Sequence, residues 1–287
     1  MQDRCTRRIA ALAGSLRSQK TLSFILHCEP KAILQTPTLS GWYCESSPFN
    51  KGLDDPAFFC MKGFVRELFS SIQGEGIKVG QRQTFIRFLG CNLSCDYCDT
   101  PITQKMEGHF VYQDKIHNNP VEVDFLIDKI TEDVIAITGG EPLLQIDFLL
   151  ELCGKLNKME KKIYLDTNAT LPDELERVIK YVSTVSLDFK IPTATRGPIL
   201  WDEHDKSLRI ALEKEVFVKI IIDENFSSHE LDKTCEIIKK TDINIPLVIQ
   251  PVFGKNIPNI MDIQKKALTR LKDVRIIPQI HKYLGIA

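Results

Sequence analysis

The sequence has no apolar run of the ~18 residues that a membrane-spanning helix needs, and it has almost no excess charge of either sign. Lysine and arginine number 37 against 38 aspartate and glutamate, which leaves a net charge of −1. This balance creates no global field to attract nucleic acid or anionic lipid. We therefore expect neither a membrane nor DNA or RNA as a partner. With 43% apolar residues over 287 positions, the chain has material for one large soluble core.

A disulfide framework is also missing. Of the nine cysteines, six lie outside one short loop and show no regular spacing. Disulfides mark an oxidising compartment, and the lack of a framework suits a reducing cytoplasm. Cys153 and Cys235 lie in helical patterns, where they are expected to be small buried apolar residues. We therefore predict a cytoplasmic protein.

What is present is a dense group of three cysteines. Cys91, Cys95 and Cys98 have the spacing C-x3-C-x2-C and follow the apolar run 85–90. A disulfide would use two of these thiols and leave the third, and a structural zinc site usually takes four ligands. No second cysteine or histidine pair follows, so an iron–sulfur cluster is favoured, because thiolates are its natural ligands. With three protein ligands, one iron of a four-iron cluster stays open to bind a reactant.

Residues 1–60 differ from the remainder of the chain. They contain Ser, Thr, Pro and Gly clusters, no sustained periodicity, and early arginines that imitate a targeting segment. The periodic, motif-bearing sequence begins at Met61. We predict a poorly structured extension or a start-site artefact over 1–60, and one domain over 61–287. The alternative is an accessory segment that packs on the domain.

Strand and helix patterns alternate along this domain. Strands are expected at 84–89, 134–137, 163–165, 182–187, 216–222 and 247–252, with a further apolar segment at 274–277. Helices are expected at 121–130, 144–158, 172–180, 203–213, 228–240 and 259–271, and residues 104–120 resemble a loop with solvent-facing His109 and His117. Strands separated by helices indicate βα units on a parallel sheet. The predicted fold class is α/β, a partial (β/α)6 barrel.

Polar residues gather where the expected strands end. Because the carboxyl ends of parallel strands share one edge, their side chains should line one mouth. Gly139 and Gly140 offer bare backbone that a ligand can approach, and Glu141 beside them is an acceptor for an ammonium group. The other strand-end groups are Asp166-Thr167-Asn168, residues 186–190, Lys219, Gln250, Gln279 and His281.

Together the motifs resemble those of the 7-carboxy-7-deazaguanine synthase family of radical S-adenosylmethionine (SAM) enzymes, from about Val65 to the C-terminus. The motifs are S-I-Q-G-E-G at 71–76, F-I-R-F-L-G-C-N-L-S-C-D-Y-C-D-T at 85–100, I-T-G-G-E-P-L-L-Q at 137–145, D-T-N at 166–168 and P-Q-I-H-K at 278–282. The resemblance implies a partial barrel of the radical SAM type, a [4Fe-4S] cluster, SAM that is regenerated, and Mg2+. It also implies conversion of 6-carboxy-5,6,7,8-tetrahydropterin to 7-carboxy-7-deazaguanine with loss of ammonia, on the pathway to queuosine or archaeosine.

The resemblance implies roles for individual residues. The cluster ligands are Cys91, Cys95 and Cys98, and Thr100 binds Mg2+. The residues expected to hold SAM are Tyr97, Cys98, Asp99, Gly140, Ser186, Leu187 and Asp188. The residues expected at the pterin are Ile72, Gln73, Gly74, Arg87, Thr138 and the C-terminal Ala287, with Glu75 nearby. Arg87 lies inside an apolar strand, where it requires an anionic partner, and it suits the substrate carboxylate.

The chain departs from the family pattern in two places. Asp166-Thr167-Asn168 stands where the family more often has Glu-Thr-Asn, and the segment 186–190 is longer than a compact Ser-Pro-Lys. The implied partners are the small pterin substrate, an electron donor such as flavodoxin or ferredoxin, and a second copy of the chain in a homodimer.

Two other functions are compatible with the cysteine loop. One is a radical SAM activase that generates a glycyl radical on a partner protein; Gln73-Gly74-Glu75 and Asp99-Thr100 disfavour it, because they suit a small polar substrate and magnesium. The other is a non-catalytic zinc or iron–sulfur module with a binding role. Cleavage of SAM by the reconstituted protein distinguishes an enzyme from such a module.

Overall fold

The computed structural model describes residues 61–286. The extension expected over 1–60 lies outside the described residues, and so does Ala287, the C-terminal residue expected to reach the substrate. Among residues 61–286, no helix has the length and apolar character needed to cross a lipid bilayer.

A ten-stranded sheet runs through the described chain, in the order β12-β11-β10-β9-β8-β7-β3-β2-β4-β5. All neighbours from β3 to β12 are parallel, so the predicted parallel sheet is confirmed, with β12 added to the six strands of the (β/α)6 unit. These strands are β3 (Arg82–Phe88), β7 (Val134–Gly139), β8 (Lys162–Thr167), β9 (Thr184–Phe189), β10 (Glu215–Ile222), β11 (Leu247–Pro251) and β12 (Val274–Ile276).

The opposite edge of the sheet is mixed. β2 runs antiparallel to β3, and β4 and β5 form a short hairpin beside β2. A separate two-stranded sheet pairs β1 with β6. The bounds are β1 (Lys62–Gly63), β2 (Val65–Ile72), β4 (Phe110–Tyr112), β5 (Lys115–His117) and β6 (Val121–Glu122).

The β4–β5 hairpin corrects the interpretation of residues 104–120 as a loop. His117 does not face solvent but is half-buried, with its ring against those of Phe110 and Phe125. Strands of three residues are too short to show an alternating pattern in the sequence. The helix expected at 121–130 is also shorter, because Val121 and Glu122 pair with β1.

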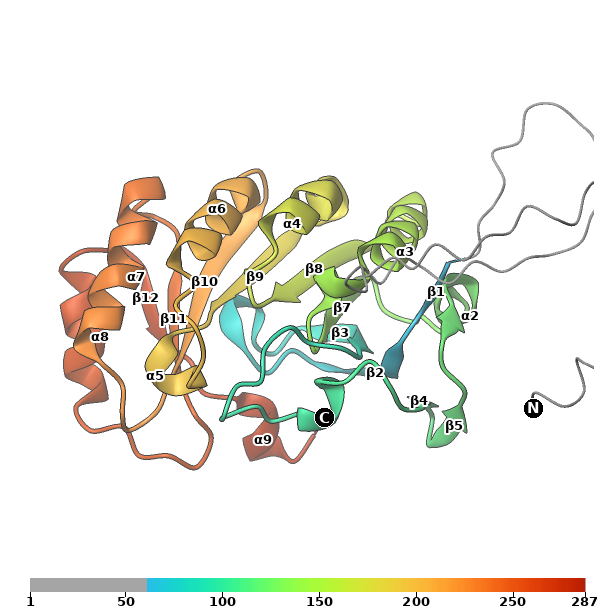
Figure 1. The fold of residues 1–287 in the computed structure, drawn as a ribbon, viewed down its shortest axis with the longest axis horizontal. Coiled ribbons are helices and arrows are strands. Elements are labelled where there is room, and N and C mark those ends of the chain that lie inside the picture. The colour runs from blue at the N-terminus through green and yellow to red at the C-terminus, as the bar shows by residue number, and fades with distance from the viewer. Residues whose placement is uncertain (1–60, 287) are drawn as a thin grey trace, which may run out of the picture. The chain divides into compact units, whose positions relative to one another are not determined.

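The longer helices cover one face of the parallel strands (Figure 1). In α3, the buried residues Phe148, Leu149, Leu152 and Leu156 recur at helical spacing and form the stripe that meets the sheet. The helices are α2 (Val123–Ile127), α3 (Ile146–Lys158), α4 (Pro172–Val178), α5 (Pro192–Thr195), α6 (Trp201–Ala211), α7 (Ser228–Thr241), α8 (Ile260–Leu268) and α9 (Ile280–Leu284). The expected helices at 144–158, 172–180, 203–213, 228–240 and 259–271 agree with α3, α4, α6, α7 and α8 within a few residues.

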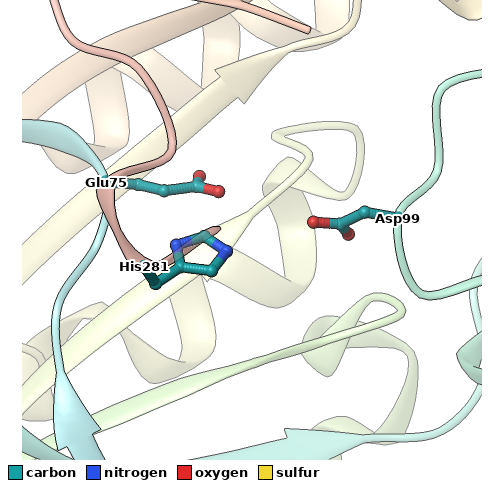
Figure 2. A group of neighbouring side chains, drawn as sticks. All are labelled: Glu75, Asp99 and His281. Atoms are coloured by element: carbon teal, nitrogen blue, oxygen red, sulfur yellow. The ribbon is translucent and has the colours of Figure 1, made fainter. Parts of the chain in front are cut away.

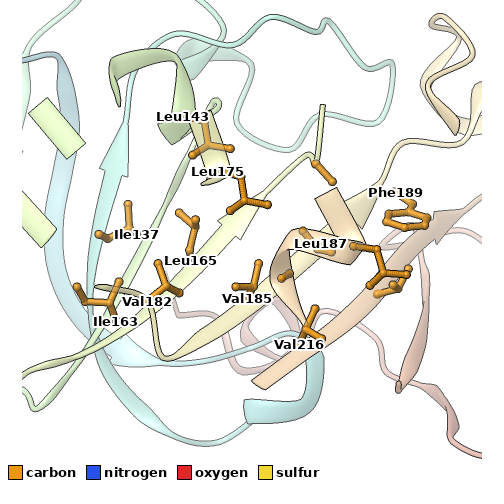
Figure 3. Packing of buried hydrophobic residues seen from close by; sticks show 14 of the residues in the cluster. Ile137, Leu143, Ile163, Leu165, Leu175, Val182, Val185, Leu187, Phe189 and Val216 are labelled. Carbon is orange, nitrogen blue, oxygen red and sulfur yellow. The ribbon is translucent and has the colours of Figure 1, made fainter. Parts of the chain in front are cut away.

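Alternation along the strands divides the sheet into two faces. Side chains such as Ile137, Leu165 and Leu187 point toward the helices and form the main core (Figure 3). On the other face, a second apolar cluster takes one residue each from β3, β7, β8, β10 and β11: Phe85, Ala136, Tyr164, Phe217 and Val248. Because successive side chains of a strand point to opposite faces, the residues two positions further along share the face of this second cluster.

Candidate active site

A cavity of about 530 Å3 opens above the second apolar cluster, at the carboxyl ends of the parallel strands. Parallel register brings Thr138 beside Arg87, Asp166 beside Ser186, and Lys219 beside Asp188. The prediction that strand-end polar groups line one mouth is confirmed for Asp166, Thr167, Asn168, Asp188, Lys190, Lys219, Gln279 and His281, all of which line this cavity.

The loop that carries the three cysteines forms one wall of the cavity. Cys91, Cys95 and Cys98 all line it, and all three thiols are free. Three thiolates on one tetrahedral zinc would lie within about 4 Å of each other, since Zn–S bonds are about 2.3 Å. Among the described residues, the group of three metal-ligand atoms that lies within 4.8 Å comes from other side chains. Thiolates are the natural ligands of an iron–sulfur cluster, and the described residues place no fourth cysteine or histidine in the wall of the cavity beside the three cysteines except His281 of α9.

Burial keeps the thiols of Cys91 and Cys95 protonated in the protein alone. It raises the pKa of Cys91 to about 11 and raises that of Cys95 as well. Thiolate is the form that binds metal, so loading the site displaces protons. The donor set fits an iron–sulfur cluster, and the adjoining cavity has room for a ligand on the open iron.

A Gly-Gly turn presses against the start of the cysteine loop. The Gly140 N–H donates to the Phe88 carbonyl, 3.0 Å, and the Glu141 N–H donates to the Gly90 carbonyl, 2.7 Å. A Cβ at Gly140 would overlap the carbonyl oxygens of Gly90 and Thr103. The absence of a side chain thus permits the close approach of the two segments, and it leaves Gly139 and Gly140 backbone exposed to the cavity.

The expected role of Glu141 as an acceptor for an ammonium group is wrong. Its side chain is fully buried, and its oxygens accept from the Leu143 N–H, the Thr167 hydroxyl and the Asn168 N–H. These bonds connect the end of β7 to the end of β8. Burial raises the pKa of Glu141 to about 7, against the hydrogen bonds, which lower it. Glu141 therefore positions the two strand ends instead of reaching a ligand.

Comparison with known proteins agrees with this geometry. The radical SAM superfamily profile matches residues 85–238. A 7-carboxy-7-deazaguanine synthase of Geobacter sulfurreducens is 37% identical over 242 residues, covering 77% of this chain and 96% of that protein. One from Archaeoglobus fulgidus is 35% identical, over 79% of this chain and 100% of that protein.

The chain belongs to the 7-carboxy-7-deazaguanine synthase family. The crystal structure of QueE from Escherichia coli has the same fold, with a TM-score of 0.51 and 21% identity over 77% of this chain and 95% of that one. The partial barrel of the radical SAM type is thereby confirmed, and a [4Fe-4S] cluster, SAM and Mg2+ are the cofactors of this family.

Most residues that the family resemblance singles out do meet at the cavity. Those that line it are Ile72, Gln73, Gly74, Arg87, Cys91, Cys95, Tyr97, Cys98, Asp99, Thr100, Thr138, Gly140 and Asp188. Ser186 and Leu187 do not line it. Ser186 is fully buried, and Leu187 points into the core on the helix side, so a contact with SAM at this point is left to the backbone or to the neighbouring Asp188.

Arg87 already has an anionic partner inside the protein. Its Nε donates to Glu67 Oε1 at 2.7 Å, across the antiparallel β2–β3 pair, and its guanidinium lies over the Phe69 ring. Both neighbours line the same cavity. One edge of the guanidinium is held by Glu67, and a guanidinium has further N–H groups with which it binds a second carboxylate.

Three further side chains converge at the cavity from two loops and from helix α9, which are far apart in the sequence (Figure 2). Ligand atoms of Glu75, Asp99 and His281 all lie within 4.8 Å of one another. The two carboxylates are already paired with cations: Glu75 with Lys219 at 2.7 Å and Asp99 with Lys282 at 3.1 Å. The two ammonium groups lie on Glu75 Oε2 and on Asp99 Oδ2, so they leave Asp99 Oδ1, on the Thr100 side, as the oxygen that can face a cation.

Thr100 and Asp99 offer hard oxygens on the other side of this group. The Thr100 hydroxyl lies 3.4 Å from Asp99 Oδ1, while Oδ2 accepts from the Gln279 amide at 3.0 Å. Magnesium keeps several waters and needs few protein ligands, so this pair fits it.

His204 supports the end of β9, although no pattern in the sequence singles it out. His204 is fully buried, stacks on Phe189, and accepts from the Lys190 N–H at 3.2 Å; burial lowers its pKa to about 3. Lys190 then reaches Asp188 at 2.8 Å and the Tyr97 hydroxyl at 3.2 Å. A histidine in an amphipathic helix gives no sign in the sequence of the strand end that it will support.

Proposed function

We propose that this chain is a 7-carboxy-7-deazaguanine synthase, which converts 6-carboxy-5,6,7,8-tetrahydropterin to 7-carboxy-7-deazaguanine with loss of ammonia. The observation that carries the proposal is that a three-cysteine loop, a bare Gly-Gly turn and the charged strand residues Arg87, Asp166, Asp188 and Lys219 all line one cavity. Relatives of that name share 37% and 35% identity over most of this chain. This assignment sets aside the activase and the non-catalytic module.

The cluster and SAM supply the hydrogen abstraction from the pterin when they are bound. Cys91, Cys95 and Cys98 hold the cluster. The surroundings of SAM are Tyr97, Asp99, Gly140 and Asp188, with the backbone of 186–188. The protein contributes position, because hydrogen transfer requires the reacting carbon and the C–H bond to be held close together.

The pterin occupies the β2–β3 side of the cavity. Arg87 binds its carboxylate, opposite the internal partner Glu67. Gln73 and Gly74 contact its ring, with Ile72 and Thr138. Glu75 and His281 face the same space. The Glu75 carboxylate accepts hydrogen bonds from the polar edge of the heterocycle, and the His281 imidazole donates to that edge or accepts from it. Thr100 and Asp99 hold Mg2+ beside it, where the ion orients substrate oxygens.

The test is anaerobic reconstitution with iron and sulfide, followed by incubation with SAM, Mg2+, a chemical reductant and the carboxypterin. Mass spectrometry of the product is expected to show 7-carboxy-7-deazaguanine. An ammonia assay is expected to show an equal amount of ammonia. Cleavage of SAM without a deazaguanine product would contradict the substrate assignment. Absence of both cleavage and a four-iron signal would contradict the whole proposal.

The reaction partners follow from the same assignment. We propose a flavodoxin or ferredoxin as the electron donor, because a single low-potential electron is needed. We further propose a homodimer in the cytoplasm. Activity with flavodoxin or ferredoxin in place of the chemical reductant tests the electron donor. Light scattering of the purified chain tests the homodimer, and fractionation of cells tests the cytoplasmic location.

A further inference from the structure

The cysteine loop has no regular secondary structure between Cys91 and Thr100, so tertiary contacts must fix its path. One set of these contacts involves Asn92, which lies between the first two cysteines. The proposed function assigns no role to Asn92. Asn92 is largely exposed, yet its amide is bonded to two side chains that are only 5% and 7% exposed, Asn168 and Thr170.

These three side chains close a ring of hydrogen bonds. The Asn168 amide donates to Asn92 Oδ1 at 2.8 Å, and the Asn92 amide donates to the Thr170 hydroxyl at 2.8 Å. That hydroxyl donates to Asn168 Oδ1 at 2.6 Å. Every donor in the ring faces an acceptor, so the amide orientations support each other.

The ring is attached to the strand ends. The Asn168 N–H donates to Glu141 Oε2 at 2.7 Å, and Glu141 belongs to the Gly-Gly turn after β7. The next residue, Ala169, is fully buried, and its carbonyl accepts from Ser207 of α6 at 2.9 Å. A continuous polar path thus runs from the cysteine loop to the backbone that borders the cavity.

We propose that Asn92, Asn168 and Thr170 form a latch that holds the first half of the cysteine loop on the ends of β7 and β8, and so sets the position of the cluster relative to SAM. They are positioning residues and contact neither reactant in this role. The inference rests on the cluster site of the proposed function. Loss of the latch leaves the Asn168 amide buried without its partner and frees the backbone between Cys91 and Cys95.

The test compares N92A, N168A and the double variant with wild type and with S94A, an exposed serine of the same loop. After anaerobic reconstitution, a chelator is added and the loss of cluster absorbance is timed. N92A and N168A are expected to lose the cluster at least about five-fold faster, a factor typical of one lost hydrogen bond. The double variant should be no faster than the faster single variant, since both break the same ring.

A second readout separates positioning from simple retention of iron. With SAM regenerated in each cycle, wild type should release little 5′-deoxyadenosine per 7-carboxy-7-deazaguanine formed. N92A, assayed while its cluster is intact, should release several-fold more. T170V, which keeps the size of the side chain and removes the hydroxyl, should behave in the same way.

The outcomes are distinct. If wild type holds the cluster and N92A matches it in cluster loss and in coupling, or if the effects of N92A and N168A multiply in the double variant, the latch is refuted while the proposed function stands. If wild type holds no four-iron cluster, both fail. Hydrogen exchange of residues 92–98 in cluster-free N92A provides a check without cofactor: exchange no faster than in wild type also refutes the latch.

Discussion

The Lys219 ammonium lies 2.7 Å from Glu75 Oε2, although the two residues are separated by 144 positions in the sequence. Lys219 is buried in β10 and also lies 3.4 Å from Asp188 and 3.6 Å from Asp166. Burial alone would lower the pKa of Lys219, but the three carboxylates raise it well above its ordinary value. One cation therefore pairs with carboxylates from β8, from β9 and from the turn after β2.

Replacing Lys219 with methionine is expected to destabilise the protein by about 3–5 kcal/mol, because it leaves buried carboxylates without their partner. Urea unfolding of the cluster-free protein measures this. Lys239→Met, at an exposed position of α7, is the matched control and should stay within about 0.5 kcal/mol of wild type. Equal stability of the two variants would show that Lys219 does not balance these acids.

The raised pKa of Glu141 predicts a pH dependence of stability. Its folded pKa of about 7 is above the ordinary 4.5, so its contribution is fully present below pH 4.5 and is lost as the pH rises through 7. Glu141→Gln does not titrate. Between pH 8 and 5.5, wild type should therefore gain about 2 kcal/mol of unfolding free energy relative to this variant. A difference between the two proteins that is constant over this range contradicts the assignment.

Replacing Cys95 with alanine is expected to abolish cluster assembly and SAM cleavage together, because it removes one of three thiolate ligands. The four-iron absorbance and the release of 5′-deoxyadenosine measure the two effects. Cys235→Ala removes a buried thiol in α7 and should retain both. Full turnover by the Cys95 variant would refute the ligand assignment.

Exchanging Thr100 for alanine should raise the Mg2+ concentration needed for half-maximal activity by about ten-fold, since it removes a proposed ligand oxygen. Binding of SAM should be largely unchanged. Thr100→Ser keeps the hydroxyl and should behave like wild type. An unaltered magnesium titration of the alanine variant would remove Thr100 from the metal site.

The sequence predicts features that depend on local order along the chain. The spacing of Cys91, Cys95 and Cys98 indicates a cluster because ligands on one short loop converge wherever that loop lies. The alternation of strands and helices indicates a parallel sheet, and parallel strands bring Asp166, Lys219 and their counterparts to one edge without further information.

Other features required the tertiary structure. The sequence offers Glu141 as a free acceptor, and only the meeting of β7 with β8 shows that its oxygens are occupied. The Asn92–Asn168 ring joins residues 76 positions apart, and nothing near either residue announces the other. Local period and spacing along the chain thus establish which chemical groups the protein carries and at which edge of the sheet they gather. Which of those groups bond to one another, and which face the cavity, depends on the packed fold, because each side chain bonds to the partner that packing brings within about 3 Å of it.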